Sequence, residues 1–125
     1  MKKILTILIA SLLWCNISFA EWVLVAVTEK DYFYYEDESI KKDNNYTYVW
    51  IMDDMIVFES PHVKSLKIHW KINCSLMQYD VMQIINYRFK LGTGASKRFD
   101  YPNVEWSSAP PGAAYDEIMK VVCSK

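Results

Sequence analysis

The segment from Ser65 to Cys74 alternates strictly between apolar and polar side chains. One phase holds Leu66, Ile68, Trp70, Ile72 and Cys74, and the other holds Ser65, Lys67, His69, Lys71 and Asn73. An alternation with a period of two is typical of a β-strand with one buried and one solvated face. The pattern therefore predicts a strand over 65–74 and places Cys74 in phase with the core.

A second alternating segment follows after a few residues. Its apolar phase comprises Met77, Tyr79, Val81, Ile85, Tyr87, Phe89 and Leu91, with Gln83 as the exception, and its polar phase comprises Asp80, Asn86, Arg88 and Lys90. Because the connection is short, we expect the two strands to pair as an antiparallel hairpin. Gly92–Ser96 is typical of a flexible turn, and Lys97–Tyr101 of a last short strand.

Three further strands are predicted nearer the N-terminus, over 22–28, 31–36 and 46–53. These runs are rich in β-branched and aromatic residues. Between the last two, the polar run 37–45 contains a turn signal at Asn44–Asn45. The segment 55–63 contains Pro61 and is expected to be a loop with a short extended piece.

The period changes near the C-terminus. After Pro110-Pro111-Gly112, apolar side chains recur at helical spacing at Tyr115, Ile118, Met119 and Val122. The sequence thus predicts an α+β fold, in which an antiparallel sheet of five or six strands is packed by one C-terminal helix.

Residues 1–20 have the layout of a secretory signal peptide. Lys2 and Lys3 precede an apolar run, and Ser18 and Ala20 place small side chains before a cut at Glu21. The apolar run is shorter than the roughly 20 residues that a membrane span needs. We therefore expect an exported protein with one domain over 21–125, located in the periplasm or on the cell surface and not spanning a membrane after cleavage.

The cysteines fit an oxidising compartment. Cys15 would leave with the signal peptide, and Cys74 and Cys123 would remain as an even pair. A disulfide is the default for such a pair in an exported chain. The alternative, a metal site or a reactive thiol, lacks a CxxC spacing and a histidine beside either cysteine.

Charge is unevenly distributed along the chain. Ten acidic and three basic residues occupy 21–61, whereas seven basic residues and one acid, Asp80, occupy 62–98. One interpretation is a positive face that binds an acidic partner, and the other is an ordinary solvated strand surface. The candidate binding residues are Lys64, Lys67, His69, Lys71, Arg88 and Lys90. Removal of Lys2 and Lys3 shifts the formal net charge from −1 to about −3, which argues against a nucleic-acid partner.

No constellation of catalytic residues is evident. His62 and His69 have no sequence partner, and the neighbouring acids Asp53 and Asp54 would point to opposite faces of a strand. We expect these two acids to be solvated turn residues. Gly92 and Gly94 form no phosphate-binding motif. We therefore expect neither catalysis nor a metal or cofactor.

An ordered set of short motifs resembles the surface-adhesin protein E family of Gram-negative bacteria. The set comprises Glu21–Val25, Tyr34–Tyr35 with Ser39–Ile40, Val49–Trp50, Lys64–Leu66, Ile72–Cys74, Trp106 before Pro110–Gly112, and Val122–Cys123. The resemblance implies a mostly antiparallel sheet with one helix, a Cys74–Cys123 bridge, export to the envelope, and dimers. The member that gives the family its name binds host extracellular-matrix and plasma proteins.

Two functional hypotheses follow. The first is a non-catalytic, adhesin-like protein that binds a protein or glycan partner, such as a host extracellular-matrix or envelope protein, through the basic strand face. The alternative is a periplasmic enzyme inhibitor or accessory factor that presents 92–98 as a protruding loop. The many aromatic side chains between Tyr32 and Trp50 either support a homodimer through the sheet or fill the core and sit singly on the surface.

Overall fold

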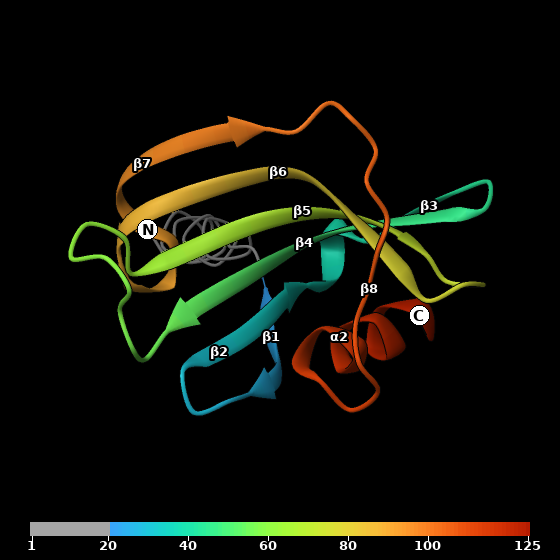
Figure 1. Cartoon of the computed structure of the whole chain (residues 1–125), viewed down its shortest axis with the longest axis horizontal. Helices are drawn as coiled ribbons and strands as arrows, with labels where there is room; N and C mark the ends of the chain where they lie inside the picture. Colours follow the sequence, from blue (N-terminus) through green and yellow to red (C-terminus); the bar gives the residue numbers. More distant parts are fainter. Residues whose placement is uncertain (1–20) are drawn as a thin grey trace, which may run out of the picture.

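The computed structural model describes residues 21–125, so the predicted signal segment 1–20 lies outside the described residues. The described chain folds into one antiparallel sheet and a C-terminal helix (Figure 1). The strands are β1 (Trp22–Val27), β2 (Asp31–Glu36), β3 (Lys41–Asp43), β4 (Tyr46–Met55), β5 (Ser65–Asn73), β6 (Gln78–Phe89), β7 (Thr93–Asp100) and β8 (Ser107–Ser108). The helix is α2 (Ala114–Cys123), and two short 3-10 turns are η1 (Asp37–Ser39) and η2 (Lys90–Gly92).

The sheet has eight strands, so the predicted number of five or six is wrong. Six strands form the main path in the order β1-β2-β4-β5-β6-β7. The other two are short: β3 pairs with β4 over three residues, and β8 pairs with β6 over two. Strands this short carry no alternation that sequence reasoning could detect.

The β5 prediction is confirmed. Ile68, Trp70 and Ile72 are buried on the face that α2 covers, which we call the helix face. The core there is completed by Phe33, Tyr35, Val49, Ile51, Ile118, Met119 and Val122. Lys67, His69 and Lys71 lie on the opposite side of the sheet, which we call the open face.

A β-bulge changes the second half of β6. Val81 pairs with Trp70 and Gln83 pairs with His69, so Met82 is an extra residue. A bulge of one residue reverses which side chains face the core. Ile84 consequently packs toward the core, and the predicted core phase of Ile85, Tyr87, Phe89 and Leu91 is wrong.

Two further boundaries differ from the sequence expectation. β4 continues through Asp53 and Asp54 to Met55, and both acids are buried, so the prediction of solvated turn residues is wrong. They do lie on opposite faces, as expected from their adjacency in a strand. Of the predicted turn at 92–96, only Gly92 lies in a turn, η2, and the rest starts β7, which runs from Thr93 to Asp100 with one irregularity in its pairing with β6.

The predicted helix and disulfide are confirmed. Cys74 and Cys123 are bonded with their Cα atoms 5.8 Å apart, which joins the end of α2 to the chain just after β5. Ala113 precedes the helix and offers no side-chain cap. Asp116 takes this role from the first turn, where its Oδ2 accepts the Gly112 N–H at 2.9 Å.

Candidate functional site

The open face presents aromatic rings in the middle of the sheet. Trp50 on β4 and His69 on β5 are cross-strand partners, and their rings stack with centroids 4.5 Å apart and an interplanar angle of 3°. The Tyr48 ring lies 6.4 Å from His69 on the other side. These three rings form an aromatic floor, in which the Tyr48 ring is tilted by 49° to that of His69, because alternate residues of paired strands share one face.

Lysine side chains lie over further rings on both sides of this floor. The Lys67 Nζ lies 5.0 Å from the Tyr87 ring centroid and 5.5 Å from that of Trp22. The Lys71 Nζ lies 4.3 Å from the Tyr46 ring, which in turn stacks on Trp106 with centroids 5.5 Å apart. Cation–π contacts of this kind hold an ammonium group in place while leaving it available to an anion.

Three hollows follow one another across the open face. The first, of about 300 Å³, is lined by Trp22, Glu36, Trp50, Lys67, Ile85 and Tyr87. The second, of about 540 Å³, is lined by Glu36, Glu38, Ser39, Lys41, Tyr48, Trp50 and His69. The third, of about 490 Å³, extends from Tyr48, His69 and Lys71 to Tyr101 and Pro102. Neighbouring hollows share side chains, so together they form one groove, which we call the trough.

His69 contributes a neutral ring to this trough. Burial lowers the pKa of His69 below its ordinary value, and the nearby charges of Lys41 and Arg98 lower it further. The positive charges of the trough come from Lys41, Lys67 and Lys71, and acids also line it: Glu36 and Glu38 near β2, and Asp80 and Asp100 in the third hollow.

The six basic residues proposed from sequence separate into two groups. Lys67, His69 and Lys71 lie together in the trough. Lys64 and Lys90 instead meet at the Phe58 ring at one end of the sheet, where Arg88 is also exposed. Sequence reasoning missed the aromatic half of the trough and the ring beside it, because Trp22 comes from β1 and Trp106, which stacks on Tyr46, comes from a segment without regular structure.

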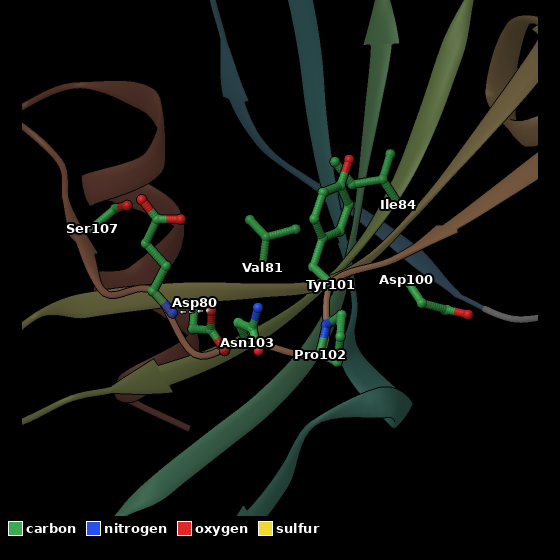
Figure 2. A pocket seen from close by; sticks show the side chains of 9 residues that line it. Asp80, Val81, Ile84, Asp100, Tyr101, Pro102, Asn103 and Ser107 are labelled. Atoms are coloured by element: carbon green, nitrogen blue, oxygen red, sulfur yellow. Dashed lines mark hydrogen bonds between the residues drawn. The ribbon is translucent and has the colours of Figure 1, made fainter.

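A cleft of about 480 Å³ lies between β6 and the segment 101–107 (Figure 2) and adjoins the third hollow of the trough, with which it shares Tyr101 and Pro102. Val81 and Ile84 lie along it on β6, and Tyr101 and Pro102 line it from the segment. The buried Asp80 holds the segment in place, since its Oδ1 accepts the Glu105 N–H at 3.0 Å. Asp80, Asp100 and Glu105 give the lining an acidic character, and the first two also line the third hollow of the trough.

The buried acids do not form a metal centre. Among residues 21–125, no group of three histidine, cysteine or acidic side chains is placed to hold a metal ion. Asp54 is paired, since its Oδ1 accepts the Leu91 N–H at 2.7 Å and its Oδ2 lies 3.4 Å from the Lys90 Nζ. Asp53 lines a small hollow of about 200 Å³ with Asp31 and Glu59.

Comparison with known proteins identifies the family. The sequence profile described as surface-adhesin protein E matches residues 22–124. The chain belongs to the surface-adhesin protein E family. The family resemblance noted in the sequence is thereby confirmed.

Solved structures share this fold. One is crystal form II of Haemophilus influenzae protein E, with a TM-score of 0.60 at 16% identity, covering 82% of this chain and 87% of that one. Another is protein E from non-typeable Haemophilus influenzae, with a TM-score of 0.58 at 14% identity, covering 86% of this chain and 79% of that one. At such low identity the likeness shows the fold alone. No curated protein sequence matches the chain. In the described part of the chain, no helix has the length and apolar character needed to cross a membrane.

Proposed function

We propose that this protein is an exported, non-catalytic surface adhesin that binds an acidic protein or glycan partner in the trough. The observation that carries the proposal is the placement of Lys67 and Lys71 over aromatic rings on either side of the Trp50–His69 stack. Family membership supports an adhesive role. In this proposal 1–20 is a cleaved signal peptide and 21–125 is the binding domain.

The chemistry of the trough suits a partner that carries negative charge and also presents C–H groups to the aromatic rings. The face of an aromatic ring carries partial negative charge and is apolar, so it packs against the C–H groups of a sugar or an aliphatic side chain. Ammonium groups bind carboxylates or sulfates through charge-assisted hydrogen bonds. A partner lying along the trough would therefore contact the Trp50 ring and meet Lys67 and Lys71 at its two sides.

A binding assay with mature protein tests the proposal. We expect purified 21–125 to bind immobilised matrix glycoproteins or heparin, and the double variant Lys67→Glu/Lys71→Glu to bind at least about tenfold more weakly, because two attractive charges become repulsive. The matched control is Lys30→Glu/Lys42→Glu, which makes the same change of net charge at exposed positions outside the trough. Equal binding by both double variants would contradict the proposed site.

The alternative of a periplasmic enzyme inhibitor has less support. It was based on a protruding loop at 92–98, and most of this segment belongs to β7 at the edge of the sheet. Protease shaving of intact cells separates the two functions. Degradation of the protein on intact cells supports adhesion, and protection until the outer membrane is opened supports a periplasmic role.

A homodimer remains a prediction. Phe33 and Tyr35 fill the core, as one of the two sequence interpretations expects. Tyr48 and Trp50 instead line the trough on the open face, where a dimer through the sheet would need them. Light scattering of the mature protein with and without heparin measures the oligomeric state directly. A dimer that closes the trough should dissociate when the ligand binds.

A further inference from the structure

Exposed apolar side chains gather at one end of the sheet. Ile56, Val57 and Phe58 follow β4, and Phe89 and Leu91 lie at the connection between β6 and β7 (Figure 1). Their exposed fractions are 40%, 52%, 43%, 51% and 54%, respectively. We call these five residues the apolar tip. Water-exposed aliphatic and aromatic side chains in such a group indicate a contact surface rather than isolated surface residues.

Hydrogen bonds fix the two connections to each other. The Met55 N–H donates to the Lys64 carbonyl at 3.1 Å, and the Lys64 N–H donates to the Tyr87 carbonyl at 2.9 Å. The Lys90 Nζ donates to the Met55 carbonyl at 2.7 Å, which joins the connection after β6 to the end of β4. The connections that carry the tip are therefore held in place by hydrogen bonds to the backbone of Met55, Lys64 and Tyr87.

The backbone at Leu91 has an unusual conformation. Its φ is +56°, in the left-handed region that residues other than glycine rarely adopt. The Leu91 N–H donates to the buried Asp54 Oδ1 at 2.7 Å, which fixes this conformation. Leu91 is therefore a large apolar residue in a strained turn, where glycine would have a lower conformational free energy. Its side chain is 54% exposed and gains little stability from burial.

Basic side chains surround the tip on the β5–β7 side. The Nζ atoms of Lys64 and Lys90 lie 5.2 Å and 5.7 Å from the Phe58 ring centroid. The exposed Arg88 directly precedes Phe89. Asp54 offsets part of the Lys90 charge at 3.4 Å, and Glu59 lies on the opposite flank beside Asp31 and Asp53. The end of the sheet that carries Phe58, Phe89 and Leu91 is therefore apolar, with Lys64 and Lys90 against Phe58 and Arg88 nearby in the chain.

We propose that the apolar tip docks on an anionic lipid surface, with Phe58, Phe89 and Leu91 entering the interface and Lys64, Arg88 and Lys90 meeting the headgroups. Aromatic and leucine side chains bordered by lysine and arginine are the combination that interfacial binding uses. Stable protein interfaces bury about 800 Å² per partner with roughly 20–30 residues a side, far more than five side chains provide. The surface is therefore better matched to a membrane than to a second protein.

Docking by the tip is compatible with the trough function. The tip is at the end of the strands, whereas the trough crosses their open face between Trp22 and Tyr101. The two surfaces share no side chain that carries either proposal. The membrane proposal therefore does not depend on the proposed adhesive function.

Vesicle sedimentation tests this proposal with mature 21–125. We expect binding to phosphatidylcholine vesicles that contain phosphatidylglycerol, weaker binding to phosphatidylcholine alone, and loss of binding as salt is raised. The variant Phe58→Ser/Phe89→Ser/Leu91→Ser should partition at least about tenfold less, because it removes the apolar contribution. Lys64→Glu/Arg88→Glu should lose the preference for anionic vesicles.

The matched control is Leu24→Ser/Leu76→Ser/Val104→Ser, which removes three exposed apolar side chains elsewhere on the surface. An unchanged thermal midpoint shows that a tip variant is folded. Lys67→Glu/Lys71→Glu should still bind vesicles, which separates this proposal from that for the trough. Absence of binding to anionic vesicles, equal partitioning of tip and control variants, or a dimer that only the tip variant abolishes would overturn the proposal.

Discussion

Asp53 is the residue whose environment departs most from what its type prefers. Its side chain is buried on the helix face near the end of β4, and its Oδ1 has no hydrogen-bond partner within the described chain. Burial, the hydrogen bond with Asp31 and the charges of Asp31, Asp54 and Glu59 raise the pKa of Asp53 to about 8. At neutral pH the folded protein therefore holds a proton here that the unfolded chain, with an ordinary aspartate pKa of 3.8, releases.

The raised pKa of Asp53 predicts that the stability of the protein depends on pH. Between about pH 4 and pH 8 the folded state binds the additional proton, so the free energy of unfolding falls as pH rises, with a slope of up to ~1.4 kcal/mol per pH unit. Asp53→Asn removes the titrating carboxyl group, so the free energy of unfolding of the variant should depend less on pH. The variant should then be more stable than the wild type near pH 8. Urea unfolding across this range measures both curves.

The exposed Asp43 on β3 provides the control for that measurement. Asp43→Asn also removes one carboxylate but should leave the slope unchanged. Parallel curves for Asp53→Asn and the wild type would show that Asp53 is ionised in the folded state.

At the scale of elements, the join between α2 and the sheet decides the architecture. Ile118, Met119 and Val122 bury the apolar stripe of α2 against β1 and β4, and the Cys74–Cys123 bond ties the last turn to the region after β5. Short helices are marginal without such packing. The helix therefore depends on the sheet for its stability.

Removal of the disulfide should destabilise this join. The bond closes a loop with a sequence separation of 49 residues, for which the chain-entropy relation gives about 4 kcal/mol. We expect Cys74→Ser/Cys123→Ser to lose up to that amount in free energy of unfolding and to show greater amide exchange in α2 than in β4 and β5. Unchanged exchange in α2 would show that apolar packing alone holds the helix.

The elements also show how far periodicity predicts structure. The alternation of β5 and the helical stripe of α2 were found from sequence because each pattern reports its own local geometry. The phase of β6 after Met82 was predicted wrongly, although Gln83 interrupted the pattern at the position where the bulge occurs. An exception in an alternating run is thus a signal for a bulge, which one strand alone cannot resolve because a bulge is defined by the register against its partner.

At the scale of the whole molecule, the described residues present three surfaces of different chemistry. The trough is aromatic, with lysines over its rings and acids at its two ends. The cleft beside the segment 101–107 is acidic, and the apolar tip is hydrophobic with a basic border. The trough and the cleft adjoin each other at Tyr101 and Pro102, whereas the tip lies at the end of the strands.

The described domain should fold by itself. All of the core residues lie between Phe33 and Val122, so we expect mature 21–125 exported to an oxidising compartment to unfold in one cooperative transition. Intact-mass measurement should show no free thiol. A non-cooperative transition, or two free thiols in folded material, would contradict the proposed domain boundary or the importance of the bond.

Sequence reasoning alone identified the strand alternation, the C-terminal helix, the cysteine pair and the family, since each is expressed in local periodicity, in residue number or in ordered motifs. It also supplied the six basic candidates but could not group them. Only the tertiary structure placed Lys67 and Lys71 beside the rings of Trp22, Tyr46, Tyr87 and Trp106, and Lys64 and Lys90 beside Phe58. The physical reason is that a cation–ring contact depends on the register between strands that are distant in the chain, and no local pattern encodes that register.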